Sequence, residues 1–425
     1  MTRLPGALGG RVTSVVLGTL AVSSIVTICT SAQLKPPDSP IPSVFFGLHI
    51  HRGGGIPWPL APFGTWRLWD ANVVWPWLEP KRGEWHFEAL DALVALAEQH
   101  HVEILLPLGR SPTWASARPA DPPKWVPGYA AEPANVDDWR EYVRTVAVRY
   151  KGRVHYYEIW NEPNARNFYT GTVEAMVNLV RVAARELKDV DSSAKIVSPS
   201  AVADVGIPWL EAFLSDGGGQ YVDIIGFHFY VDWQPPEAMV PLIAKVQAVM
   251  AQHGVRDKPL WNTEAGWPIE NHIKGDSAPS PSPRALTDGD ASAYVARAYV
   301  LNWAAGVSRF YWYAWDDKVT GLTEPNGVTP KRPASAYAAI ERWLVGARMT
   351  SCAADDKGIW SCHLTRGHGY EGWILWTPNR ATPFQIPAEW AVRRLRDLSG
   401  NQRDLAPRSE IEIGPLPILV ERPGQ

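Results

Sequence analysis

The sequence predicts an α/β fold, a closed (β/α)8 barrel of the TIM type followed by a small antiparallel β-domain. Two observations support this prediction. Short apolar runs alternate with amphipathic stretches over residues 44–343, and the alternation stops near residue 344. Apolar runs of four to eight residues are typical of parallel strands buried on both faces. Eight such runs favour a closed barrel over an open sheet.

The elements of the predicted barrel follow one another with the regularity of βα units. The eight predicted strands are Val44–Ile50, Gly64–Trp69, Val102–Leu108, Val154–Trp160, Lys195–Ser198, Val222–Phe229, Pro259–Asn262 and Arg309–Ala314. Amphipathic periodicity predicts helices between them at Phe87–His100, Val136–Tyr150, Val173–Lys188, Ala238–His253 and Ala291–Ala305.

The C-terminal part, residues 344–425, has a different pattern. Short strand-like runs separated by Gly, Pro and Asn indicate an antiparallel β-domain, with strands predicted at 358–364, 371–376, 383–386, 392–397 and 410–420. Packing against the barrel is the favoured role for this domain, and binding of sugar is the alternative.

The N-terminus has the features of an export signal. Arg3 and Arg11 make it basic, Val12–Cys29 is mostly apolar, and small residues precede a cleavage point after Ala32. We therefore predict a signal peptide over residues 1–32, a Pro- and Ser-rich linker over 33–43, and a secreted or periplasmic protein. A membrane anchor that stays uncleaved is the alternative, since the apolar run is just long enough to span a bilayer.

Three cysteines occur, and Cys29 lies in the predicted signal. Cys352 and Cys362 are ten positions apart, and an exported protein enters an oxidising compartment. A disulfide between them is therefore expected, with two unpaired buried thiols as the alternative. The sequence has no CxxC or HExxH pattern, so no metal site is expected.

The composition indicates a globular protein and disfavours nucleic acid as a partner. The formal net charge is −3 and no long run of Lys and Arg occurs, so nucleic acid is not an expected partner. The 22 Trp residues are an unusually large number. A large aromatic core is one explanation. The other is a cleft for carbohydrate, because the flat indole ring matches the C–H face of a sugar.

Two predicted strands end in a carboxylate. The segment Tyr156–Asn164 contains the end of the fourth strand and, just after it, Glu162. The segment Pro259–Pro268 contains the seventh strand and, just after it, Glu264. Functional side chains of a TIM barrel lie at the C-terminal ends of its strands. A carboxylate placed there on an apolar framework costs free energy unless it has a function. Two such groups suit glycoside hydrolysis, in which one carboxyl donates a proton and the other attacks the anomeric carbon.

The Trp160–Pro163 element, Trp-Asn-Glu-Pro, resembles the acid/base signature of the clan A glycoside hydrolases. Glu264 stands where that clan keeps its nucleophile. Residues 44–343 are most similar in style to glycoside hydrolase family 39 and related exopolysaccharide-cleaving enzymes. The resemblance implies retaining hydrolysis of a β-glycosidic bond in an oligo- or polysaccharide by double displacement, without a cofactor. Glu162 would be the general acid/base and Glu264 the nucleophile.

Other positions match the clan one by one, and the resemblance implies their roles. Arg67 would support the ionised nucleophile, and Asn161 would donate to the 2-hydroxyl of the sugar. His228 and Tyr230 stand at the end of strand six, and the Tyr hydroxyl would bind the nucleophile. Trp315, after strand eight, would form the floor beneath the sugar.

Several alternatives stay open. Arg67 could instead pair with Glu158, which should also point into the barrel. His49 and His51 follow the first strand, and Trp114 follows the third. Each could contact substrate, or could serve as a cap or core residue. A transglycosidase or a non-catalytic polysaccharide-binding protein could also use the same cleft.

Overall fold

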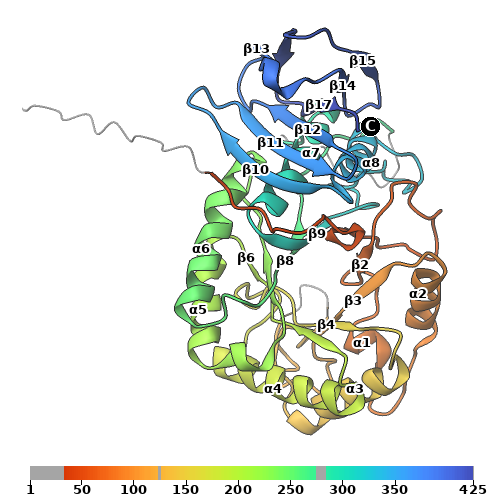
Figure 1. Cartoon of the computed structure of the whole chain (residues 1–425). Helices are drawn as coiled ribbons and strands as arrows, with labels where there is room; N and C mark the ends of the chain where they lie inside the picture. Colours follow the sequence, from red (N-terminus) through yellow and green to blue (C-terminus); the bar gives the residue numbers. More distant parts are fainter. Residues whose placement is uncertain (1–32, 123–125, 274–283, 425) are drawn as a thin grey trace, which may run out of the picture.

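The structure is a computed structural model that describes residues 33–122, 126–273 and 284–424. Its central feature is a curved sheet of parallel strands in the order β5-β4-β3-β2-β1-β9-β8-β7-β6 (Figure 1). The strands are β1 (Phe46–His49), β2 (Thr65–Arg67), β3 (Glu103–Leu108), β4 (Tyr156–Ile159), β5 (Lys195–Val197), β6 (Ala201–Val202), β7 (Ile225–His228), β8 (Leu260–Ala265) and β9 (Val307–Trp312).

The sheet closes into a barrel where β5 and β6, which together form its fifth strand, meet β7. β5 and β6 are consecutive pieces of one chain segment, yet they stand at opposite ends of the strand order. β5 continues toward β7 through a parallel bridge from Val197 to Ile224, and β6 pairs with β7 directly. The predicted eight-position barrel is therefore confirmed, with an interruption in its fifth strand.

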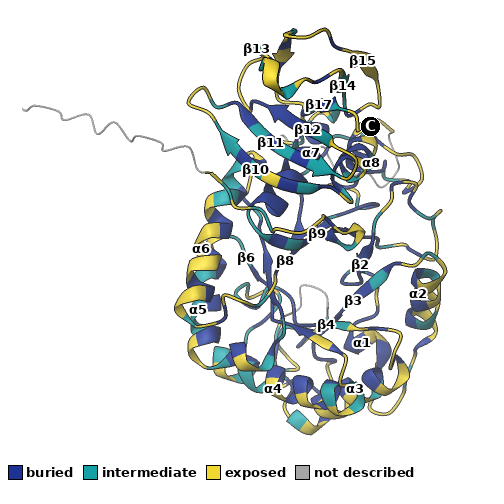
Figure 2. Ribbon diagram, in the orientation of Figure 1, coloured by how far each residue is buried: buried dark blue, intermediate teal, exposed yellow. Residues whose placement is uncertain are grey.

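Helices surround the barrel, and each buries one face against it. They are α1 (Trp75–Leu78), α2 (Glu88–Gln99), α3 (Val136–Arg149), α4 (Val173–Val190), α5 (Ile207–Ser215), α6 (Met239–Gln252), α7 (Asp288–Ala304) and α8 (Arg332–Leu344). Thr172 caps α4 by accepting from the N–H of Ala175, and Thr287 caps α7 in the same way. In Figure 2 the outer faces of α3 to α6 are exposed and the inner faces are buried.

Helix α7 differs from the others because it is buried on every side from Ala293 to Ala304, apart from Tyr294. A helix that is buried all round lies between two layers of structure. α7 lies between the barrel and the C-terminal strands (Figure 1).

The C-terminal part forms the predicted antiparallel β-domain. Its main sheet has the order β10-β11-β12-β17-β14-β15, and β13 pairs separately with β16. The strands are β10 (Arg348–Ala354), β11 (Trp360–Arg366), β12 (Tyr370–Trp376), β13 (Thr382–Gln385), β14 (Arg394–Arg396), β15 (Gln402–Asp404), β16 (Glu410–Ile413) and β17 (Ile418–Arg422). The expected strand at 410–420 is two strands, since the chain turns after Ile413.

The β-domain packs directly on the barrel. Trp360, Ile374 and Trp376 belong to the same hydrophobic core as the barrel strands and helices. The Trp376 indole N–H also donates to Glu237 Oε1 at 2.8 Å. The segment predicted as a linker runs along this sheet, where the Leu34 N–H donates to the carbonyl of Cys352 at 3.0 Å.

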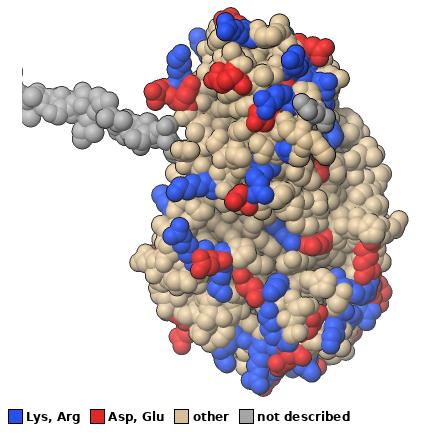
Figure 3. Space-filling view, in the orientation of Figure 1, with Lys and Arg blue, Asp and Glu red and all other residues tan. Residues whose placement is uncertain are grey.

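Cys352 and Cys362 are joined by a disulfide and face each other in the β10–β11 pair, as expected. The predicted signal over residues 1–32 lies outside the described residues. Of the helices that are described, none combines the length and the apolarity needed to cross a bilayer. On the face shown in Figure 3, basic and acidic side chains are interspersed.

Candidate active site

Glu162 stands just beyond the C-terminal end of β4, in a short segment with unusual backbone angles. Trp160 and Glu162 have φ values of 68° and 44°. Left-handed angles cost free energy for non-glycine residues, so surrounding contacts must hold them. The Trp160 indole donates to the carbonyl of Phe168 at 2.8 Å, and the Glu162 N–H donates to the carbonyl of Ser200 at 2.9 Å. These contacts hold the carboxyl of Glu162 at the barrel mouth.

Glu264 is the fifth residue of β8, a strand that is buried throughout. Arg67 Nη1 donates to its Oε2 at 2.8 Å, and the Tyr230 hydroxyl donates to its Oε1 at 3.0 Å. Arg67 comes from β2 and Tyr230 follows β7. Each oxygen of Glu264 therefore has a donor from a different part of the barrel.

Arg67 connects three residues at the mouth. Besides Glu264, its Nε donates to Glu158 Oε2 at 2.6 Å and its Nη2 donates to Asn161 Oδ1 at 2.8 Å. Ser200 donates its hydroxyl to the second oxygen of Glu158. Both contacts considered for Arg67, one with Glu264 and one with Glu158, are thus present in one side chain.

The Glu162 and Glu264 carboxyls lie close together. One oxygen of each lies within 4.8 Å of the other, and a ring nitrogen of His228 is inside the same limit. His228 is fully buried, and its Nδ1 lies 3.0 Å from Glu162 Oε1. Such a donor set could hold a cation. The Arg67 guanidinium, however, already places a positive charge against Glu264, which disfavours a second cation there.

Burial raises the pKa of Glu264 to about 7. The positive charges of His228 and Arg67 oppose this rise, and the negative charge of Glu162 adds to it. Burial, together with Glu264, also raises the pKa of Tyr230 well above its usual value. Tyr230 therefore stays protonated and remains a hydrogen-bond donor. Two carboxyls this close together can share one proton, because their like charges disfavour ionisation of both.

His49 is part of the framework beneath the site. It is fully buried, and its Nε2 lies 3.0 Å from the carbonyl of Thr263, the residue before Glu264. Because a carbonyl can only accept, Nε2 carries the proton. Burial and the charge of Arg67 hold the pKa of His49 well below its usual value, so the ring is neutral.

Trp315, predicted to form the floor beneath the sugar, and Trp114, for which a cleft and a core role were both considered, are packed against other residues. Trp315 is 4% exposed, and its backbone bonds to His49 and Thr323. That burial leaves little ring surface for a sugar. The indole of Trp114 is half-buried, donates to the carbonyl of Glu79 at 2.9 Å, and meets Trp75 edge to face.

The sequence did not indicate Tyr313, the first residue beyond β9. Its hydroxyl donates to Asp70 Oδ2 at 2.9 Å, and its ring meets that of His49 at 5.0 Å. The charge of Glu264 contributes to the raised pKa of Tyr313, so the two side chains are neighbours.

Comparisons with known proteins agree with this geometry. A family model described as glycosyl hydrolases family 39 matches residues 85–298. A beta-xylosidase from Caldicellulosiruptor saccharolyticus is 32% identical over 111 residues, which cover 24% of this chain and 22% of that protein. Endo-1,4-beta-xylanase 2 from Claviceps purpurea is 38% identical over 84 residues, covering 20% and 24%. The chain thus spans less than a quarter of the length of either relative.

Solved structures match over nearly the whole chain. A family 39 glycoside hydrolase from Bacteroides cellulosilyticus WH2 has a TM-score of 0.70 at 19% identity, covering 91% of this chain and 82% of that one. A family 39 beta-xylosidase from Caulobacter crescentus has a TM-score of 0.64 at 16% identity, covering 92% and 97%. At these identities the likeness shows a common fold.

The family model spans just over half of the chain, and both Glu162 and Glu264 lie within the matched residues. The barrel, the two carboxyls at its mouth and the match lead to one conclusion: the chain belongs to glycosyl hydrolase family 39.

Proposed function

We propose that this protein is a retaining β-glycosidase that hydrolyses an oligo- or polysaccharide by double displacement. The observation that carries the proposal is the proximity of Glu162 and Glu264, whose nearest oxygens lie within 4.8 Å. Retaining enzymes have their two carboxyl groups about 5–5.5 Å apart. Inverting enzymes keep them about 6.5–9.5 Å apart to leave room for a water molecule.

The contacts of the two glutamates support different roles. Glu264 accepts from Arg67 and Tyr230, and hydrogen bonds to a carboxylate favour its ionised form. Glu264 is therefore the nucleophile. It attacks the anomeric carbon as the bond to the leaving oxygen breaks, and Glu162 gives that oxygen its proton. Glu162 then takes a proton from water, whose oxygen displaces Glu264.

A β-xyloside is the first substrate to test, because relatives in two comparisons are named as beta-xylosidases. New reducing ends from xylan, β-glucan, mannan and bacterial exopolysaccharides would then identify the natural polymer. Action outside the cytosol is supported by the signal-like N-terminus and by the Cys352–Cys362 disulfide.

The roles can be tested by azide rescue on an activated aryl β-xyloside. Glu162→Ala should keep the first step, accumulate the glycosyl-enzyme and lose about 10²–10⁴-fold in turnover. Azide should restore turnover and yield a β-glycosyl azide. Glu264→Ala should lose the first step, and azide there should yield an α-azide.

The matched control is Glu174→Ala, an exposed glutamate of α4, which should keep wild-type rates. Exchanged stereochemistry of the two azide products would exchange the two roles. Wild-type rates in both active-site variants, on a confirmed substrate, would refute the proposal.

A further inference from the structure

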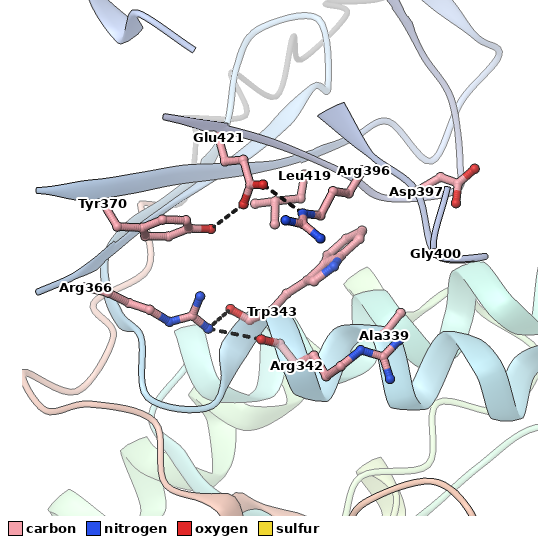
Figure 4. A pocket seen from close by; sticks show the side chains of 10 residues that line it. All are labelled: Ala339, Arg342, Trp343, Arg366, Tyr370, Arg396, Asp397, Gly400, Leu419 and Glu421. Atoms are coloured by element: carbon pink, nitrogen blue, oxygen red, sulfur yellow. Dashed lines mark hydrogen bonds and ion pairs between the residues drawn. The ribbon is translucent and has the colours of Figure 1, made fainter. Parts of the chain in front are cut away.

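A cavity of about 350 Å³ lies between α8 and the β-domain, outside the site described above (Figure 4). Residues of the last turns of α8 form one wall and residues of the sheet form the other. The lining residues are Ala339, Arg342, Trp343, Arg366, Tyr370, Arg396, Asp397, Gly400, Leu419 and Glu421. Pockets of about 300–1,000 Å³ are the usual size for small ligands, so one sugar unit fits.

The cavity lies at the opposite end of the barrel from the two glutamates. In a (β/α)8 barrel each helix runs back from the C-terminal ends of the strands toward their N-terminal ends. Ala339, Arg342 and Trp343 belong to the end of α8, whereas Glu162 and Glu264 stand at the C-terminal ends of β4 and β8. Ligand in this cavity therefore does not contact the catalytic carboxyls.

The acidic residues of the cavity already have their partners. Glu421, which is buried, accepts from Arg396 Nε at 2.7 Å and from the Tyr370 hydroxyl at 3.1 Å. Asp397 accepts from the backbone N–H groups of Ser399 and Asn401 within its own turn. Neither carboxylate needs a ligand.

The arginines, in contrast, keep donors unused. Arg366 contacts the carbonyls at the end of α8 through Nη2 alone. The Arg342 side chain is exposed and forms no hydrogen bond or ion pair with the described residues. Three arginines also outnumber the two acidic residues in the lining. Because guanidinium forks match carboxylates, the excess charge and donors suit an anionic group.

The cavity also has aromatic side chains beside these donors, of which Tyr370 is half-buried and Trp343 is 6% exposed, so Tyr370 supplies most of the accessible ring surface. Figure 4 shows the Trp343 indole rising from α8 toward Arg396 and Leu419, with the Tyr370 ring on the sheet opposite. Aromatic rings pack against the C–H faces of pyranose rings. We propose that this cavity is a second, non-catalytic saccharide site that binds an acidic sugar unit, a uronate. Its use in holding a polymer rests on the glycosidase function proposed above.

The site can be tested by titration calorimetry with trigalacturonate and with neutral xylotriose as comparator. The mature chain would carry Glu264→Gln so that neither probe is hydrolysed. Trigalacturonate should bind, and Arg342→Ala should raise its Kd at least about tenfold. That is the effect of losing one charged hydrogen bond. Arg332→Ala is the matched control, an exposed arginine of the same helix about 15 Å from Arg342. It should leave binding unchanged.

Four results would overturn the proposal. The first is that trigalacturonate does not bind, and the second is that Arg342→Ala and Arg332→Ala weaken its binding equally. The third is that Arg342→Ala weakens xylotriose binding as much as trigalacturonate binding. The fourth is that sulfate displaces trigalacturonate at matched ionic strength. The outcome is independent of catalysis. In an otherwise wild-type chain, Arg342→Ala should keep its rate on the aryl β-xyloside, and failure of the azide experiment would leave the calorimetric result standing.

Discussion

Glu264 determines how the protein should respond to pH. Its pKa is raised to about 7 by burial, so the carboxyl gains a proton below that pH and can no longer act as the proposed nucleophile. On an activated aryl glycoside, kcat/KM should therefore fall about tenfold per pH unit below pH 7. A pH profile of the wild-type enzyme checks this expectation.

The neighbouring carboxylate provides a sharper form of the same test. Glu162 raises the pKa of Glu264 through its negative charge. Glu162→Gln removes that charge, so the acidic limb of kcat/KM on the aryl glycoside should move to lower pH. Glu174→Gln removes an equal charge from the surface of α4 and should leave the limb in place. A limb that moves to higher pH in Glu162→Gln would contradict this account of the site.

At the scale of elements, the position of Glu264 depends on close contact between the ends of β8 and β9. Gly266 follows β8, and a Cβ added there would lie 2.1 Å from the backbone carbonyl oxygen of Tyr313. A backbone atom cannot rotate away, so Gly266→Ala must displace one strand end. Activity should fall at least tenfold, because displacement of about 1 Å can cost a hundredfold.

Gly289→Ala is the matched control for this substitution. Its added Cβ would meet nothing closer than 3.8 Å, in the first turn of α7. That variant should keep full activity on the aryl glycoside. Full activity in folded Gly266→Ala, as judged by near-ultraviolet circular dichroism, would show that the strand ends tolerate the shift.

At the scale of the whole molecule, the barrel and the β-domain share one hydrophobic core, with α7 buried between them. We therefore expect a single calorimetric unfolding transition for the chain. Trp376→Ala removes a fully buried indole at this interface and its bond to Glu237, and should cost about 3–5 kcal/mol.

Activity and tertiary structure should be lost at the same, lowered temperature in Trp376→Ala. Trp233→Ala, an exposed residue, should change the melting temperature little. Two separate transitions, of which only one moves in Trp376→Ala, would show that the β-domain unfolds independently of the barrel.

The sequence alone predicted the barrel and the location of both glutamates at the C-terminal ends of two of its strands. Parallel strands buried on both faces must be apolar, so their runs stand out, and their C-terminal ends meet at one rim. Glu162 and Glu264 were therefore expected near each other, although one follows β4 and the other lies near the end of β8. The short polar strand β15 and the first strand of the β-domain, β10, were missed. β15 is fully exposed and has no apolar alternation to indicate it.

Tertiary structure decided which side chains surround the glutamates. Arg67 binds Glu158, Asn161 and Glu264, partners up to 197 residues away, because a guanidinium at the centre of a barrel reaches several strands at once. The last strand ends at Trp312, two residues before the predicted end, so Tyr313 leaves the sheet first and Trp315 enters the core. Such boundaries depend on packing between distant segments, which local sequence patterns do not contain.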